Sequence, residues 1–270
     1  MAESPGPRAV QTLVVLGDSI GVGIGDPIGG GNWRGFAPLL ADAMDARLVN
    51  LSTSGARVRS MRATQLPEAV GARPDAAVLM AGMNDTMRSD FDTAQLAADL
   101  DRVMSTLGAL GAAMVAVRYH DHSQVFRLPG PLRRMLTGRI DAYNTTLETV
   151  AARHGAGVLD LGMLPNTYDR EYWSVDRLHP SELGYRMLAR GLAGRFTELG
   201  VAVPREISAE CSGGVPVSTA MHVAWLVFKG IPWLCRRGKD LIPHAIATMV
   251  REAMADEPLP APEPPTEPSY

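Results

Sequence analysis

The sequence predicts an α/β fold, a three-layer α/β/α sandwich built on a five-stranded parallel sheet, with a C-terminal helical extension. Short aliphatic runs alternate with longer segments in which apolar residues recur every three or four positions, and Gly, Pro, Asn or Asp separates neighbouring segments. This alternation is typical of a parallel sheet covered by helices on both faces. Ligand sites in such folds lie at the carboxyl ends of the strands.

Five runs of β-branched and aliphatic residues supply the predicted strands, because each is short, apolar and bounded by turn residues. They are Thr12 to Leu16, Arg47 to Leu51, Ala76 to Met80, Ala113 to Arg118 and Gly157 to Leu161. We expect all five to be buried and parallel.

Four segments have the apolar spacing of helices. They are Phe36 to Met44, Leu96 to Leu107, Ile140 to His154 and Ser181 to Leu199. In the third, Ile140, Tyr143, Leu147 and Val150 share one face, and Gly155 ends the helix before the last strand. The fourth would close the domain.

The composition of the chain changes near Pro204 and again near Glu257. We expect a flexible N-terminus over residues 1–9, the main domain over 10–203, a helical extension over 204–256 and a disordered Pro-rich tail over 257–270. The apolar segment from Ala220 to Leu234 is too short, and too interrupted by polar residues, Gly and Pro, to span a bilayer.

Composition and charge exclude several classes of function. The net charge of -3 gives no basic surface for a nucleic acid. The two cysteines, Cys211 and Cys235, indicate neither a disulfide framework nor a cysteine metal site. The first ten residues lack the basic and apolar regions of a signal peptide, so we expect a cytoplasmic protein.

The first candidate for chemistry is Ser19, in Gly17-Asp18-Ser19. A buried strand ends there in a Gly turn and presents a serine at the start of the next segment, the position of a nucleophile in α/β enzymes. The same tripeptide is also an ordinary turn or helix-capping sequence, with Asp18 as the capping acceptor. Other residues have to decide between the two interpretations.

Four further residues follow predicted strands in order. Gly55 comes after the second strand, where a glycine lets a backbone N–H approach a ligand, and Asn84 follows the third, where its amide could donate to an oxyanion. Asp176 and His179 come about fifteen residues after the fifth strand. Their spacing lets the carboxylate accept from one imidazole nitrogen while the other nitrogen faces the serine.

With these residues the sequence resembles the SGNH hydrolases, also called GDSL lipases and esterases, over roughly residues 10 to 200. The resemblance implies a flavodoxin-like sandwich, Ser19 as nucleophile, Asp176 and His179 as the rest of a triad, and an oxyanion hole formed by Ser19, Gly55 and Asn84. Ile20 replaces the usual Leu after the serine, which is a conservative change.

The resemblance implies a serine ester hydrolase that acts on a small-molecule ester through an acyl-enzyme, with neither a cofactor nor a metal. An acyltransferase that passes the acyl group to a sugar or another alcohol stays open, because the motifs are the same. A non-enzymatic alternative assigns the function to the C-terminal extension, where Trp225, Lys229 and Trp233 would bind a membrane surface or a partner. Oligomeric state is not predicted.

Competing motifs are weaker. Gly17 to Gly21 also satisfies G-x-S-x-G, but the nucleophile elbow of α/β-hydrolases follows several strands, and here only one precedes the serine. The glycines from Gly21 to Gly25 do not complete a dinucleotide-binding G-x-G-x-x-G.

Three other polar positions have structural explanations. His120-Asp121-His122 are too close in sequence to converge on one metal ion; we expect a solvated loop, or otherwise a wall of the substrate pocket. Asp85 would fix the loop of Asn84, and Trp173 would line the pocket or pack its own loop.

Overall fold

The computed structural model describes residues 6–125 and 130–212 of the 270-residue chain. Five parallel strands form the main sheet in the order β4-β1-β5-β6-β7. Their bounds are Thr12–Gly17 for β1, Arg47–Asn50 for β4, Ala76–Met80 for β5, Ala113–Arg118 for β6 and Gly157–Asp160 for β7. The bounds of each predicted strand are confirmed to within one residue. The expectation that all five strands are buried is wrong for β4, whose residues are exposed or half-buried because it lies at an edge of the sheet.

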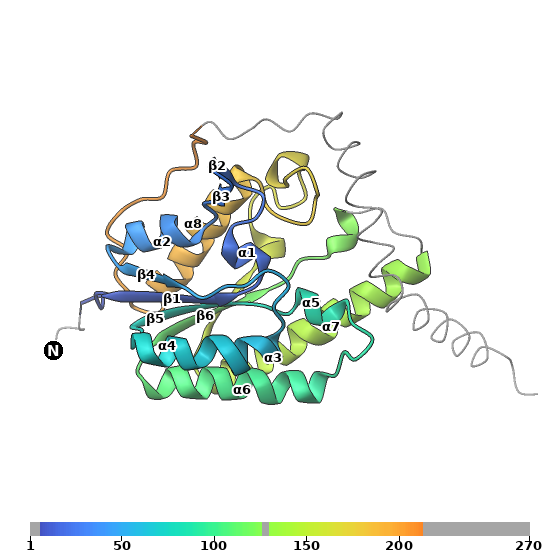
Figure 1. The fold of residues 1–270 in the computed structure, drawn as a ribbon, viewed down its shortest axis with the longest axis horizontal. Helices are drawn as coiled ribbons and strands as arrows, with labels where there is room; N and C mark the ends of the chain where they lie inside the picture. The colour runs from blue at the N-terminus through green and yellow to red at the C-terminus, as the bar shows by residue number, and fades with distance from the viewer. Residues whose placement is uncertain (1–5, 126–129, 213–270) are drawn as a thin grey trace, which may run out of the picture.

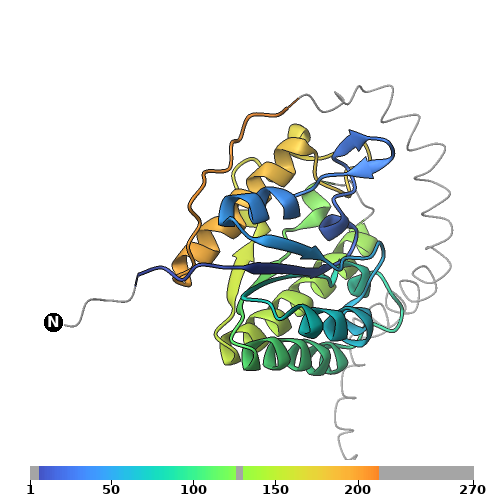
Figure 2. The same cartoon turned by 60° about the vertical axis from the view of Figure 1, so that its left-hand side comes forward.

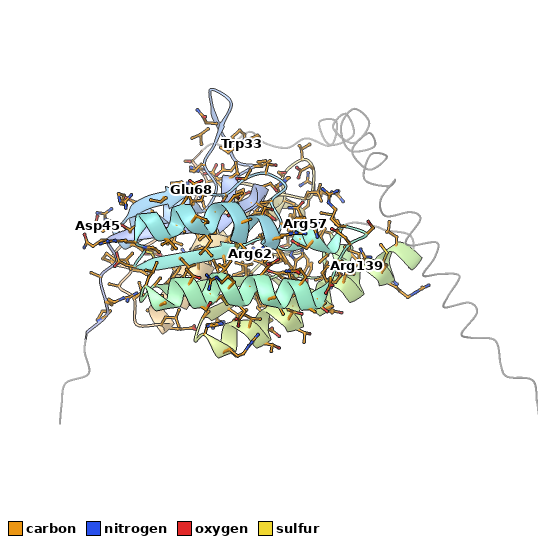
Figure 3. The ribbon with its side chains drawn as sticks, turned by 60° about the horizontal axis from the view of Figure 1, so that its bottom comes forward. Trp33, Asp45, Arg57, Arg62, Glu68 and Arg139 are labelled. Carbon is orange, nitrogen blue, oxygen red and sulfur yellow. The ribbon has the colours of Figure 1, made fainter. Side chains whose placement is uncertain are left out.

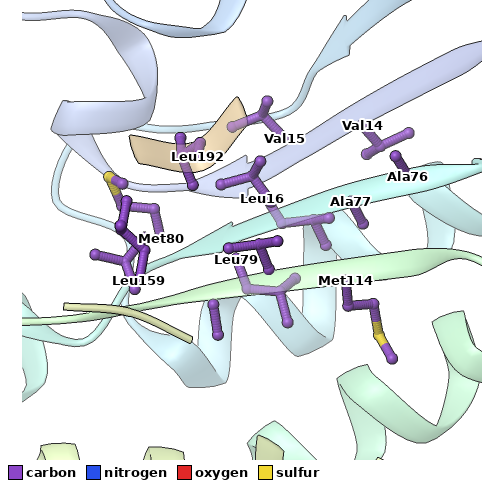
Figure 4. Packing of buried hydrophobic residues seen from close by; sticks show 14 of the residues in the cluster. Val14, Val15, Leu16, Ala76, Ala77, Leu79, Met80, Met114, Leu159 and Leu192 are labelled. Atoms are coloured by element: carbon purple, nitrogen blue, oxygen red, sulfur yellow. The ribbon is translucent and has the colours of Figure 1, made fainter. Parts of the chain in front are cut away.

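The centre of the sheet is a continuous apolar core. Every residue of β1 and β5 is buried, and their side chains pack against those of neighbouring strands and helices (Figure 4). Gly17 at the end of β1 pairs with Met80 at the end of β5, so these two strands end side by side. Loops that follow them therefore start from adjacent points at one edge of the sheet.

Helices cover both faces of the sheet, which confirms the predicted three layers (Figure 1). On one face lie α2 (Ala37–Met44) and α8 (Glu182–Glu198), which pack against each other. On the other lie α4 (Leu66–Ala72), α6 (Thr93–Ala109) and α7 (Gly130–Arg153). Figure 2 shows the two helical layers from another side. The helices α6 and α7 begin earlier than their apolar spacing indicated.

Two elements between the predicted ones were missed. A short hairpin of β2 (Pro27–Gly29) and β3 (Asn32–Trp33) projects from the domain, as the position of Trp33 in Figure 3 shows. A helical stretch of α3 (Val58–Ser60), the π-helical η1 (Met61–Gln65) and α4 joins β4 to β5. Its arginines and buried Gln65 interrupt the apolar spacing of a helix, and Arg62 reaches Asp99 of α6 at 2.6 Å.

Short helical turns follow the strands at the carboxyl edge. They are α1 (Ser19–Val22), α5 (Met83–Thr86), η2 (His122–Gln124), η3 (Leu161–Met163) and η4 (Arg170–Tyr172). Two of these turns carry Ser19 and Asn84, so the candidate site lies where the α/β rule expects it.

Both ends of the described chain pack on the domain. Arg8 forms a parallel bridge with Val201, and Ile207 is buried in the core. Arg205 contacts Asp42 and Asp45 at 2.8 and 2.6 Å. The expected C-terminal helices and Pro-rich tail lie outside the described residues. Within residues 6–125 and 130–212, no helix is long and apolar enough to cross a membrane.

Candidate active site

Ser19 lies at the first position of α1, directly beyond the end of β1. The turn is close to its neighbours: a Cβ on Gly21 would lie 2.1 Å from Ser52 Oγ and 2.7 Å from Ser52 Cβ. Only a glycine lets α1 start this near the loop that follows β4. The serine is therefore placed by a buried strand and by close packing on the next loop.

His179 lies on the segment 161–181, which follows the edge strand β7. We call this segment the histidine loop. Its Nε2 lies 2.8 Å from Ser19 Oγ, and its Nδ1 lies 2.6 Å from Asp176 Oδ2. The three side chains form an unbroken hydrogen-bonded chain from carboxylate to hydroxyl. Such a chain lets the imidazole take up the serine proton.

Asp176 is fixed on its other side by three donors. Its Oδ1 accepts from Ser174 Oγ at 2.7 Å, Leu178 N at 2.8 Å and His179 N at 3.0 Å. Burial raises the pKa of Asp176, but the hydrogen bonds and the charge of His179, with the Ser174 hydroxyl, outweigh it and lower the pKa below its ordinary value. The carboxylate therefore stays ionised beside the imidazole.

The histidine loop folds back on itself to hold these residues. Trp173 and Pro180 form an antiparallel bridge, and Ser174 N donates to His179 O at 2.9 Å. Trp173 Nε1 donates to Thr167 O at 2.7 Å. Trp173 also lines a pocket described below. It therefore both packs its own loop and lines a pocket, the two roles that the sequence left open.

Asp18 is almost completely buried and acts as a local acceptor. Its Oδ1 accepts from Ile20 N at 3.0 Å, which caps α1, and its Oδ2 accepts from Asn84 Nδ2 at 3.2 Å. Burial raises the pKa of Asp18 to about 6, against the opposing effects of the Ile20 N–H and His179. Asp18 therefore caps α1, as the sequence predicted.

Asn84 and Gly55 reach the same cleft as Ser19 and His179. All four line a cleft of about 160 Å³. Gly55 has a φ of +79°, in the left-handed region that favours glycine. Asn84 Nδ2 also donates to Ala56 O at 3.1 Å, which ties it to the loop of Gly55. The structure thus brings together every site residue that the sequence predicted.

Asp85 connects the loops that follow β4 and β5. Its carboxylate accepts from Val58 N at 3.1 Å and from Arg57 Nε at 3.2 Å. Figure 3 shows Arg57 at the start of the helical stretch that leads to Arg62. Since Asp85 adjoins Asn84, this contact fixes the Asn84 loop, as expected from the sequence.

The expectation of a solvated loop at His120-Asp121-His122 is wrong. His120 and His122 are buried, with exposed fractions of 3% and 6%, because the aromatic residues of the histidine loop cover them. Both line an apolar pocket of about 50 Å³, which makes them the pocket wall of the second interpretation. Asp121 caps η2 instead, accepting from Ser123 N.

Four apolar residues of the site were not predicted from the sequence. Ile20, Met83, Met87 and Leu178 line both the cleft and the apolar pocket. Ile20, Met83 and Leu178 each directly precede or follow a motif residue in the sequence, and that adjacency is the signal that could have found them. Within the described part of the chain, no three His, Cys, Asp or Glu side chains are grouped as metal ligands would be.

Comparison with known proteins bears on the family and the fold of the chain. Residues 15–187 match the model of the GDSL-like lipase/acylhydrolase family. A solved structure of an α/β hydrolase enzyme from the metagenome of Lake Arreo, Spain, is similar at 22% identity and a TM-score of 0.57, over 69% of this chain and 95% of that one. No curated protein matches the chain.

Two further solved structures are similar at the level of the fold. The lipase/acylhydrolase from Enterococcus faecalis has 20% identity and a TM-score of 0.56, over 70% of this chain and 95% of that one. A catalytic mutant of an acetylxylan esterase from Geobacillus stearothermophilus has 19% identity and a TM-score of 0.55, over 73% and 98% of the two chains.

Proposed function

This chain belongs to the GDSL-like lipase/acylhydrolase family and is an esterase, and we propose that it cleaves carboxylic esters through an acyl-enzyme on Ser19. The observation that carries the proposal is the hydrogen-bonded chain from Asp176 through His179 to Ser19, with links of 2.6 and 2.8 Å. These distances are within the range for proton transfer between a base and a nucleophile.

In the first half of the reaction, His179 Nε2 takes the proton of Ser19 as Oγ attacks the ester carbonyl. Asp176 stabilises the imidazolium and keeps its Nδ1 protonated. When the tetrahedral intermediate collapses, the bond from carbon to the alcohol oxygen breaks, and His179 gives its proton to the leaving alcohol. The acyl group remains on Ser19.

The N–H groups of Ser19 and Gly55 and the Asn84 amide would stabilise the negative charge on the carbonyl oxygen. Asn84 Nδ2 donates to Asp18 and Ala56 at 3.2 and 3.1 Å, which are long hydrogen bonds. A developing oxyanion therefore competes effectively for one of its hydrogens. Water completes the cycle: His179 takes its proton, the hydroxide attacks the acyl carbon, and Ser19 regains its proton as the acid leaves.

Hydrolysis of p-nitrophenyl esters from acetate to palmitate tests the assignment. Wild type should release p-nitrophenol, and Ser19→Ala and His179→Ala should reduce kcat/KM to near the uncatalysed rate. Ser105→Ala, on α6 away from the cleft, is the matched control and should keep full activity. Activity retained by folded Ser19→Ala would refute the proposal. Mass spectrometry after treatment with a fluorophosphonate should place the adduct on Ser19.

A further inference from the structure

A second pocket adjoins the cleft that holds Ser19. Ile20, Met83, Met87 and Leu178 line both the cleft and this pocket, whose volume is about 50 Å³. The rest of the pocket lining includes His120 and Trp173. The cleft and the pocket are therefore adjacent, with these four apolar side chains between them.

His120 places a polar atom in this apolar wall. It has an exposed fraction of 3%, and its Nε2 lies 2.9 Å from His122 Nδ1. Its other nitrogen, Nδ1, is buried and has no hydrogen-bond partner within residues 6–125 and 130–212. Buried polar atoms of folded proteins nearly always have a partner. A group bound in the pocket that His120 lines would supply this missing partner.

The neighbouring rings keep the imidazole in place. The ring centroid of Trp173 lies 4.9 Å from that of His120 and 5.5 Å from that of His122. Burial lowers the pKa of His120 well below its ordinary value and lowers that of His122 to about 4. Both imidazoles are therefore neutral near pH 7.

A neutral imidazole that is bonded through Nε2 presents Nδ1 as a donor in one tautomer and as an acceptor in the other. A hydroxyl group satisfies both tautomers, because it donates and accepts. A charged group would lose its hydration in an apolar pocket without gaining a counter-charge. The chemistry of the wall thus selects a neutral hydroxyl.

The size of the pocket limits the length of the group that carries this hydroxyl. A cavity of roughly 150 Å³ accepts a benzene molecule, and this pocket has about a third of that volume. A branch of about two to four carbon and oxygen atoms fits, and a long acyl chain does not.

We propose that this pocket binds a short, hydroxyl-bearing branch of the ester, with the hydroxyl hydrogen-bonded to His120 Nδ1. This specificity rests on the proposed ester cleavage at Ser19. The branch belongs either to the acid or to the alcohol of the ester, and the two sources are distinguished by separate substrate pairs.

The acid pair is p-nitrophenyl 3-hydroxybutyrate and p-nitrophenyl butyrate. The alcohol pair is 3-hydroxypropyl acetate and propyl acetate, followed by acid release. In one pair, the hydroxylated ester should have a kcat/KM about 10- to 100-fold higher, the range for satisfying a buried polar group. The pair that shows the preference identifies the side of the ester that enters the pocket.

Two variants test whether the preference for the hydroxylated ester depends on His120 Nδ1. In His120→Gln the amide replaces Nε2 and leaves nothing at the position of Nδ1, so the ratio of the two kcat/KM values should fall towards one. In His120→Asn the amide lies near the position of Nδ1, so most of the ratio should remain. The ratio cancels any general loss of activity. His154→Gln, which lies at the end of α7 and contacts Asp101, is the matched control.

Wild type that hydrolyses plain esters without preference in either pair would overturn this pocket assignment and leave the proposed function intact. A preference that survives in His120→Gln would also overturn it. Absence of esterase activity in folded wild type on every ester would instead refute the proposed function, and the pocket assignment with it.

Discussion

Ser19 and His179 meet in one cleft but are placed by different means. Ser19 follows β1 by two residues and lies between loops that follow the neighbouring strands β4 and β5. His179 follows β7, which is at the far edge of the sheet, and the histidine loop has to return across β6 and β5 to reach the serine. The serine position depends on the buried sheet, and the histidine position depends on hydrogen bonds within a loop.

This difference predicts two kinds of mutational effect. Substitutions at the serine turn, residues 17–22, act on packing against the sheet and should change the free energy of unfolding. Substitutions in the histidine loop act on the orientation of the imidazole and should change the rate of ester cleavage with less effect on stability. Four changes test this contrast.

The largest effect is expected for Asp176→Asn. The amide can keep the acceptor that binds Leu178 N and His179 N. Its NH₂ group would face His179 Nδ1, which then has to be an acceptor, so the proton moves to Nε2 and the imidazole can no longer deprotonate Ser19. We expect kcat/KM to fall by about 10⁴-fold. The control is Asp169→Asn, which changes an exposed carboxylate of the same loop. Equal values of kcat/KM for the two variants would show that Asp176 does not orient the imidazole.

Asp18 tests the serine turn through pH. Its pKa is raised from 3.8 to about 6 by burial, so the folded protein holds this proton more tightly than the unfolded chain. The free energy of unfolding should therefore fall as the pH rises from about 4 to about 6, by about 3 kcal/mol from this group. Asp18→Asn should lack this decrease.

Chemical denaturation of wild type and Asp18→Asn at a series of pH values from 4 to 8 measures the difference. Asp169→Asn, with an exposed side chain, should follow wild type throughout. Parallel curves for wild type and Asp18→Asn would show that the buried carboxylate does not limit stability.

Gly21→Ala should destabilise the serine turn by about 1 to 3 kcal/mol, because the added methyl overlaps Ser52. The matched control is Gly71→Ala in α4, where an added Cβ has no atom within 4 Å. That change should stabilise by up to about 1 kcal/mol, through helix propensity. Thermal denaturation should show a lower melting temperature for Gly21→Ala and an equal or higher one for Gly71→Ala. A Gly21→Ala protein as stable as wild type would contradict the close packing.

The smallest effect is expected for Ser174→Ala in the histidine loop. It removes one of three donors to Asp176 Oδ1 and should raise the pKa of Asp176. We expect kcat/KM to fall by about 2- to 10-fold, the range for one hydrogen bond, with the acid limb of its pH profile moved to higher pH. An unchanged profile would show that the backbone donors alone fix the carboxylate.

The sequence identified the strands and the main helices because their apolar periodicity follows from which faces are buried. It was less informative between β4 and β5. There the π-helical turn positions Gln65 so that its side chain bonds Gly17 N at 2.8 Å and Gly17 O at 2.9 Å. This polar pairing depends on a contact between residues far apart in the chain, and no local periodicity indicates it.

What the sequence determined by itself was the sheet and the order of the residues that follow its strands, since buried strands and turn glycines have local signatures. Ser19, Gly55 and Asn84 could be placed because each lies in the loop that follows a strand. Only the tertiary structure decided that the loop of His120 and His122 is buried and lines a pocket. The covering residues come from the histidine loop, some fifty positions later, and whether a polar residue meets solvent depends on such distant partners.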